Sequence, residues 1–75
     1  MNIKFVEKNQ DWKNETTRYW FEVAVGGDDD GQYCVADRNG ELKLLDSEGY
    51  PVLSENDHYR ILDALKPHYE AHIND

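Results

Sequence analysis

The sequence predicts an α+β domain: an antiparallel β-meander of four to five strands with a C-terminal α-helix, kinked at a proline, packed on one face. Apolar and polar residues alternate in several short segments before Ser54, which is the pattern of half-buried strands. Asn39-Gly40 is a pair preferred in two-residue turns between antiparallel strands. Beyond Ser54 the apolar residues return at spacings of three and four, as on one helix face. With 75 residues, the chain is expected to form one domain over 1–75.

The strands are predicted from this alternation and from β-branched and aromatic residues. Segment 18–25 (RYWFEVAV) is the strongest, because such residues favour a pleated, half-buried surface. The mostly polar segment 8–17 before it predicts a loop. Pro51 has no N–H to donate to a ladder, so the last strand is expected at a sheet edge. The expected strands span 2–7, 18–25, 32–36, 41–45 and 50–53.

Turn-forming residues separate these strands. Segment 26–31 (GGDDDG) ends the strongest strand, since Gly and Asp are poor in strands and favoured in turns. Asn39 and Gly40 suit the two positive-φ positions of a type I′ turn. Segment 46–49 (DSEG) predicts a second turn of the same kind.

The helix is expected to begin at Ser54. Ser54 and Asp57 resemble a capping box, and acidic residues favour the positive end of the helix dipole. Pro67 interrupts the helical pattern, because its ring clashes with the carbonyl of an earlier turn. It predicts a kink there, or an end near Lys66 and a restart. The apolar stripe of the helix comprises Ile61, Leu62, Leu65, Tyr69 and Ile73.

The core is expected between one sheet face and this stripe. The sheet contributes Ile3, Phe5, Tyr19, Phe21, Val23, Val35, Leu42 and Leu44. The helix covers them with Leu62, Leu65, Tyr69 and Ile73. The other sheet face is expected to meet solvent with Arg18, Trp20, Glu22, Cys34, Ala36 and Lys43.

The charge of the chain is strongly acidic and unevenly distributed. Sixteen acidic and eight basic side chains give a formal net charge of −8 and a pI near 4.6. Segment 22–57 carries ten acidic residues against two basic ones, whereas 1–21 is at +1 and 58–75 at −1. Such a field repels nucleic acid and acidic membrane surfaces and attracts basic proteins. Direct nucleic-acid binding is disfavoured, because affinity for phosphate chains rests on Lys and Arg.

The remaining composition predicts a soluble, cytoplasmic protein. The single Cys34 cannot form the internal disulfides that are common in small secreted domains. The longest apolar runs are a few residues, against the roughly 20 that a membrane-spanning helix needs. The N-terminal segment MNIKFVEKNQ lacks the apolar centre of a signal peptide.

Two patterns are candidates for metal binding, and neither meets its requirements. If Gly31 takes the glycine position of a calcium loop, Gly26, which has no side-chain ligand, falls on the first ligand position. His68 and His72 share one helix face, but His-Tyr-Glu-Ala-His is not the His-Glu-x-x-His of metalloproteases. A solvated acidic turn at 28–30 and two exposed histidines are expected instead, without a metal or other cofactor.

Catalytic patterns are absent from the sequence as well. Cys34 lies in the middle of a strand, with no nearby basic residue to lower the pKa of its thiol. Ser47 and Ser54 are explained by a turn and a helix cap. We therefore expect a protein without enzymatic activity.

Charge and aromatic residues predict a small acidic inhibitor that mimics nucleic acid and occupies the basic nucleic-acid-binding surface of a partner protein. In size and composition alone, the chain resembles phage anti-defence proteins, such as the anti-CRISPR type, and immunity proteins against nuclease toxins. Trp20 lies on the face opposite to its aromatic neighbours and is the expected anchor. The expected partner-binding residues are Trp20, Glu22, Asp28, Asp29, Asp30, Asp37, Glu41, Asp46, Glu48, Glu55 and Asp57.

Two other classes of function stay open. One is a generic, non-catalytic interaction module or a homodimer that uses the open sheet face or an edge strand, with Trp20 against its own copy. The other is a metal-dependent enzyme or sensor built on His68 and His72 or on the turn at 28–30. Trp20 would otherwise cover a minor cluster on the second sheet face or pack against the N-terminal loop.

Overall fold

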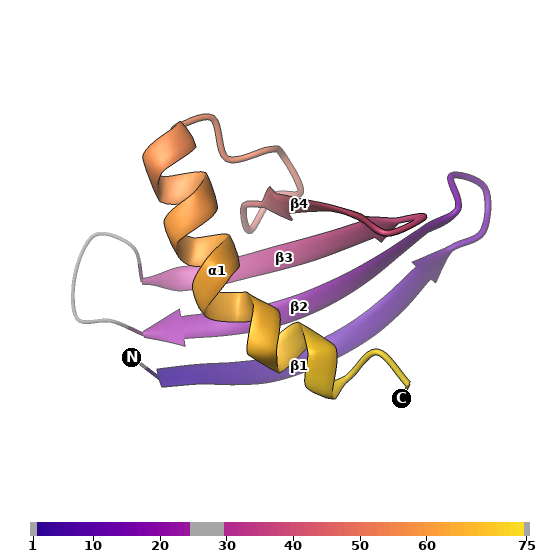
Figure 1. The fold of residues 1–75 in the computed structure, drawn as a ribbon, viewed down its shortest axis with the longest axis horizontal. Coiled ribbons are helices and arrows are strands. Elements are labelled where there is room, and N and C mark those ends of the chain that lie inside the picture. The colour runs from indigo at the N-terminus through magenta and orange to yellow at the C-terminus, as the bar shows by residue number, and fades with distance from the viewer. Residues whose placement is uncertain (1, 25–29, 75) are drawn as a thin grey trace.

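The computed structural model describes residues 2–24 and 30–74. Within them, successive strands pair antiparallel in the order β1-β2-β3-β4, and a helix crosses one face of this meander (Figure 1). The predicted α+β class is confirmed, with a sheet of four strands. The elements are β1 (Asn2–Asp11), β2 (Thr16–Ala24), β3 (Gly31–Arg38), β4 (Glu41–Leu45) and α1 (Glu55–Ala71).

The first hairpin is longer than its sequence pattern indicates. Residues 8–11 continue β1 and 16–17 begin β2, so the prediction of a loop over 8–17 was wrong for most of its length. Alternation of apolar and polar residues indicates a strand only where one of its faces is buried. The polar residues of this edge pair are held in the sheet by backbone hydrogen bonds, which leave no such pattern in the sequence. Only 12–15 form the turn, and the Asp11 carboxylate accepts the backbone N–H of Lys13 at 3.1 Å to close it.

A β-bulge in β1 changes which of its side chains face the helix. Phe5 and Glu7 pair with consecutive residues of β2, which leaves Val6 as an extra residue. After the bulge, Lys8 rather than Glu7 lies on the helix side of the sheet. Its ammonium nitrogen lies 5.3 Å from the centre of the Tyr19 ring, within the range of a cation–π contact.

The turn between β3 and β4 has the predicted geometry. Asn39 and Gly40 both have positive φ, at 54° and 89°, as a type I′ turn requires. The Asp37 carboxylate accepts the Gly40 N–H at 2.9 Å and so secures the turn from the strand. The predicted turn between these two antiparallel strands is therefore confirmed.

The turn after β4 is different from the one expected. In 46–49 only Gly49 has positive φ, at 88°. The Asp46 carboxylate instead accepts the N–H groups of Glu48 and Tyr50 at 2.9 and 3.0 Å, which is an Asx-type turn. Beyond this turn, a single bridge between Leu45 and Pro51 takes the place of a fifth strand, because Pro51 cannot donate to a ladder.

The helix begins where the sequence predicts and continues through Pro67. The Ser54 hydroxyl accepts the Asp57 N–H at 3.4 Å as the N-cap. The helix extends to Ala71, so Pro67 does not end it, and Figure 1 shows one ribbon that crosses the sheet without a break. Ile73 lies beyond the helix and is 40% exposed, so its assignment to the core was wrong. A spacing of three and four residues places side chains on one face only within a helix, and Ile73 follows the last helical residue.

The main core lies between the sheet and the helix, as predicted. Ile3, Phe5, Tyr33, Leu42 and Val52 are partly buried against it. Its buried members are Tyr19, Phe21, Val23, Val35, Leu44, Ile61, Leu62, Leu65 and Tyr69.

The second sheet face also carries a small core, which the sequence prediction of a solvated face missed. Cys34, Ala36 and Leu45 are buried there, and half-buried Trp20 packs against them. Trp20 pairs with Cys34 on the neighbouring strand, and Cys34 pairs with Leu45 on the next one. The Trp20 indole therefore lies against this cluster. Glu22 and Lys43 on this face are exposed as expected.

Candidate partner-binding surface

Two adjoining hollows lie between the end of β4 and the first turns of α1. The larger, of about 430 Å³, is lined by Tyr33, Asp46, Tyr50, Pro51, Val52, Leu53, Asp57 and Ile61. The smaller, of about 100 Å³, shares Val52 and Leu53 and adds Glu55, His58 and Tyr59. These residues, together with Glu48, form what we name the β4–α1 surface.

Local hydrogen bonds shape this surface. The Val52 N–H donates to the Leu44 carbonyl at 3.1 Å, and the Val52 carbonyl lies 3.3 Å from His58 Nδ1. Val52 is thereby held against the main core, between the sheet and the helix. The next residue, Leu53, is left 90% exposed.

Exposed apolar side chains gather around the two hollows. Tyr50 and Tyr59 are 66% and 62% exposed, and with Leu53 they contribute three large apolar side chains to one region. Single exposed apolar residues are normal on a protein surface, but a group around a hollow is typical of an interaction site. Tyr50, Leu53 and Tyr59 were not among the partner-binding residues predicted from the sequence. Tyr59 lies on the helix but off its apolar stripe, which was an available signal, whereas Leu53 precedes the helix.

The same region is acidic. Asp46, Glu48, Glu55 and Asp57 lie within 46–59, a segment that contains neither Lys nor Arg. Arg60 follows and pairs with Asp57 at 2.9 Å. These two side chains stay about half exposed, so water screens their attraction and the pair contributes little stability. The β4–α1 surface therefore combines an apolar floor with carboxylates.

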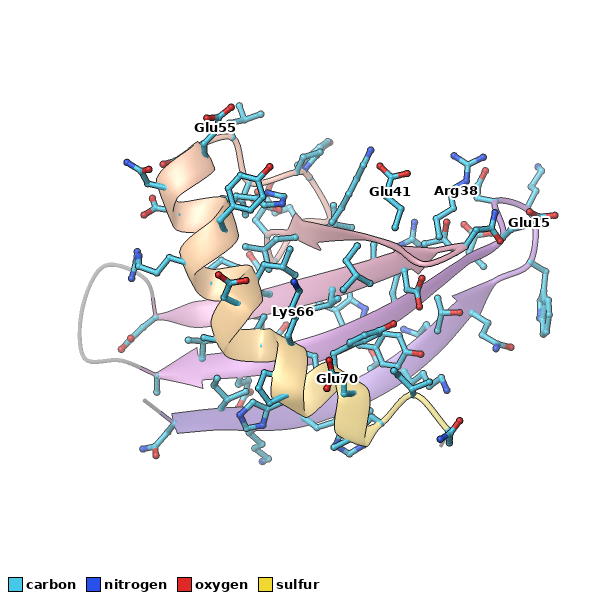
Figure 2. The ribbon with its side chains drawn as sticks, viewed as in Figure 1. Glu15, Arg38, Glu41, Glu55, Lys66 and Glu70 are labelled. Carbon is cyan, nitrogen blue, oxygen red and sulfur yellow. The ribbon has the colours of Figure 1, made fainter. Side chains whose placement is uncertain are left out.

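The structure distributes the expected partner-binding acids among several places. Asp46, Glu55 and Asp57 line the hollows of the β4–α1 surface, and exposed Glu48 lies in the turn that follows β4. Exposed Asp30 immediately precedes β3. Figure 2 shows Glu55 at one end of the molecule, and Glu41 with Arg38 towards the other. Asp28 and Asp29 lie outside the described residues.

Asp37 has an internal structural role. It lies on the helix side of β3, where its carboxylate accepts the Tyr69 hydroxyl at 2.7 Å and the Gly40 N–H at 2.9 Å. Burial, and then the bond to Asp37, raise the pKa of Tyr69. Asp37 thus joins the sheet, the hairpin turn and the helix, and its carboxylate is already occupied.

The open sheet face, which carries Trp20 and Glu22, is electrically balanced. Its strand register places four cationic and four anionic residues on it. The cations are Lys4, Arg18, Arg38 and Lys43, and the anions are Glu7, Asp11, Glu22 and Glu41. Arg18 lies 3.6 Å from Asp11. The acidic excess therefore resides on other parts of the molecule.

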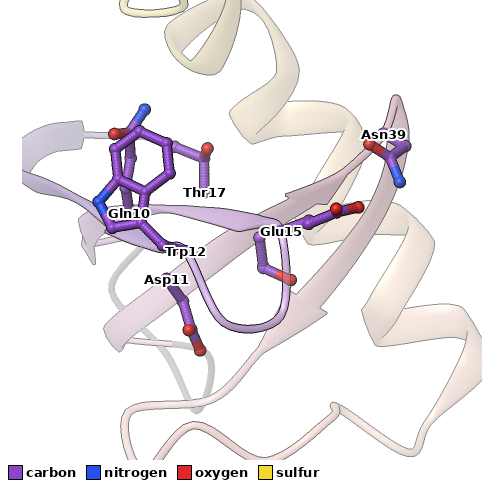
Figure 3. A pocket seen from close by; sticks show the side chains of 7 residues that line it. Gln10, Asp11, Trp12, Glu15, Thr17 and Asn39 are labelled. Atoms are coloured by element: carbon purple, nitrogen blue, oxygen red, sulfur yellow. The ribbon is translucent and has the colours of Figure 1, made fainter.

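A third hollow, of about 450 Å³ and thus similar in volume to the larger of the first two, lies at the far end of the first hairpin. Figure 3 shows Trp12, which is 81% exposed, beside Gln10 and Thr17, with Glu15 and Asn39 on the other side. The Asp11 carboxylate is already bonded to the loop: it accepts the Asn14 side-chain amide at 2.8 Å. This bond is the main cause that holds the pKa of Asp11 below its ordinary value.

Of the candidate metal and thiol residues, His72 and Cys34 are packed against other side chains. His72 stacks on Phe5 with ring centres 3.8 Å apart, and it is half-buried, so the expectation of two exposed histidines was wrong for this one. His68 is exposed as expected. Across 2–24 and 30–74, no three His, Cys, Asp or Glu residues are grouped as metal ligands. Burial raises the pKa of the Cys34 thiol to about 12, so it is protonated at neutral pH and a poor nucleophile.

No protein-family model, curated protein or solved structure matches the chain. Among the described residues, no helix is both long and apolar enough to cross a membrane. The function is therefore inferred from the chain's own residues.

Proposed function

We propose that this chain is a small acidic inhibitor that binds the basic, nucleic-acid-binding surface of a partner protein. The β4–α1 surface supports this, because Asp46, Glu55 and Asp57 line its hollows together with exposed apolar side chains. These side chains are Tyr50, Leu53 and Tyr59. A nucleic acid presents phosphates together with flat base faces, and basic proteins bind both. Carboxylates beside tyrosine rings offer the same two kinds of contact. The proposed role needs no catalytic step and no cofactor.

Charge and apolar contact have separate roles in this proposal. A net charge of −8 attracts a basic partner and speeds association, and added salt weakens this effect. An exposed ion pair contributes only about 0.2–1 kcal/mol, so carboxylates alone give weak binding. Most of the binding energy of an interface comes from a few buried aromatic or large side chains. Tyr50, Leu53 and Tyr59 are the side chains available for this on the β4–α1 surface.

The proposal is tested by competition with nucleic acid. The chain is immobilised, exposed to a nuclease-treated lysate of its source cells, and eluted with a single-stranded oligonucleotide or with salt. We expect basic nucleic-acid-binding proteins to be retained and to be released by both. Retention of proteins that the oligonucleotide does not displace would exclude a shared surface.

A matched pair of variants separates the β4–α1 surface from general acidity. Glu48→Gln, Glu55→Gln and Asp57→Asn together remove three negative charges from it. Glu7→Gln, Glu22→Gln and Glu41→Gln remove three from the open sheet face. We expect retention to fall with the first triple variant and to persist with the second. Equal losses would assign the effect to net charge.

A second candidate function, self-association through the open sheet face, is favoured by one observation. That face is neutral on a chain of charge −8, so two copies can approach there with the least repulsion. Trp20 would then contact its own copy above the small core. Light scattering during size-exclusion chromatography tests this: a concentration-dependent dimer that Trp20→Ala abolishes supports it, and a constant monomer mass refutes it. We also propose a cytoplasmic location, where a single thiol stays reduced.

A further inference from the structure

The β4–α1 surface has a shape and chemistry that also indicate which side chains its basic partner presents to it. We propose that it binds a partner segment in which one aromatic or large aliphatic side chain stands between lysines and arginines. This deepens the proposed function and rests on it. The apolar side chain would enter the larger hollow, and the flanking cations would meet the carboxylates around it.

The lining of the larger hollow supports an apolar occupant. Tyr33, Val52 and Ile61 belong to or pack against the main core, so this wall is held in place. Tyr50 and Leu53 are the exposed members of the lining. The volume of about 430 Å³ falls within the roughly 300–1,000 Å³ of ligand pockets. Enclosing an apolar side chain here removes apolar surface of both molecules from water.

The charges around the hollow support cationic flanks. Asp46 and Asp57 line it, and Glu55 lines the adjoining smaller hollow. Asp57 already has Arg60 at 2.9 Å, and one oxygen of the Asp46 carboxylate accepts two backbone N–H groups of its own turn. Both keep their negative charge, Glu55 adds a third, and segment 46–59 holds no lysine or arginine. An acidic segment would be repelled, and a neutral one would gain nothing from these carboxylates.

This chemistry narrows the class of partner. Proteins that bind single-stranded nucleic acid combine a basic groove with aromatic side chains on which bases stack. Binding to the backbone of a duplex rests on Lys and Arg alone and needs no exposed aromatic residue. A hollow between acidic residues fits the first kind of surface, because it can receive the aromatic side chain that a base would otherwise cover.

Two synthetic peptides test the inference. Fluorescein-labelled GSRKFKRSG and GSRKAKRSG have the same charge and differ only in the central side chain. Binding to the intact chain is measured by fluorescence anisotropy at low and at physiological salt. We expect the phenylalanine peptide to bind about tenfold more tightly, a difference of about 1.4 kcal/mol. Equal affinities, or no binding of either peptide, would overturn the inference.

Single-residue variants locate the contact. Leu53→Ala removes a side chain that is 90% exposed, so the fold is expected to persist, and a thermal melt checks this. It should reduce the preference for phenylalanine to less than about threefold while the alanine peptide binds as before. Tyr50→Ala is the second variant on the same hollow. Trp12→Ala, an exposed aromatic residue at the other end of the molecule, is the control and should change neither affinity.

The outcomes separate the inference from the proposed function. If both peptides bind equally and Leu53→Ala has no effect, while the oligonucleotide still displaces the captured partners, the charge-based function stands and this inference fails. If the phenylalanine preference is present but nucleic acid displaces no partner, the inferred peptide site stands and nucleic-acid mimicry fails.

Discussion

Replacing Tyr69 by Phe removes one hydrogen bond that joins the helix to the sheet. The hydroxyl donates to the Asp37 carboxylate at 2.7 Å, and the ring itself is buried against Tyr19. A hydrogen bond to a charged group contributes about 1.5–3 kcal/mol. Asp37 is only half-buried, so water replaces the lost donor in part, and we expect the low end, about 1.5 kcal/mol.

This loss is large for so small a domain and is readily measured. A chain of this length has a total stability of roughly 4–11 kcal/mol, so the variant should melt about 6–12 °C lower. Urea unfolding followed by circular dichroism gives the free energy of unfolding of both proteins. Tyr59→Phe, on a tyrosine that is mostly exposed, is the matched control and should stay within about 0.5 kcal/mol of the original chain. If the two variants lose equally little, the Asp37–Tyr69 bond does not stabilise the fold as argued.

The pH dependence of this loss provides an independent check. Burial and the Asp37 contact raise the pKa of Tyr69 above its ordinary value of about 10. In the unfolded chain Tyr69 ionises near that value, whereas in the folded chain it stays protonated to higher pH. The stabilisation is therefore complete below about pH 10 and is lost as the pH rises further. The difference in stability between the original chain and Tyr69→Phe should shrink above about pH 10; a constant difference would contradict this.

Three further outcomes are expected. Leu65→Ala should cost about 2–5 kcal/mol in urea unfolding, because Leu65 is fully buried; a loss below about 1 kcal/mol would mean that the core closes around it. Glu15→Gly should raise the melting temperature, since Glu15 has a positive φ of 54° that costs a non-glycine residue about 1–2 kcal/mol. Cys34 should react with a thiol reagent only when the chain unfolds, and Trp20→Ala should speed this reaction; rapid labelling of the original chain would contradict its burial.

The dimensions of the core explain why single contacts matter here. The helix covers one sheet face, and one indole covers the small cluster on the other. A domain of this size buries only about 60% of its unfolded surface, so few apolar contacts are available to replace a lost one. Packing of Phe5 against His72 and of Tyr19 against Tyr69 extends the core through aromatic rings.

The sequence alone determined the fold class, the type I′ turn and the start of the helix. These features depend on neighbouring residues: alternation in 18–25, positive φ at Asn39 and Gly40, and the cap at Ser54. Local preference and tertiary packing agree at each of these places, so the local signal was sufficient.

Only the tertiary structure decided which residues share a surface. The bulge at Val6 exchanged the faces of the residues after it, and the pairing of Trp20 with Cys34 created the second cluster. Asp37 and Asp57 both carry negative charge in the sequence, yet Asp37 is half-buried and bonded to Tyr69, whereas Asp57 lines the β4–α1 surface. Net charge is a sum over residues and can be read from the sequence. A binding surface depends on which segments, distant in the chain, pack side by side, and local sequence patterns do not specify that packing.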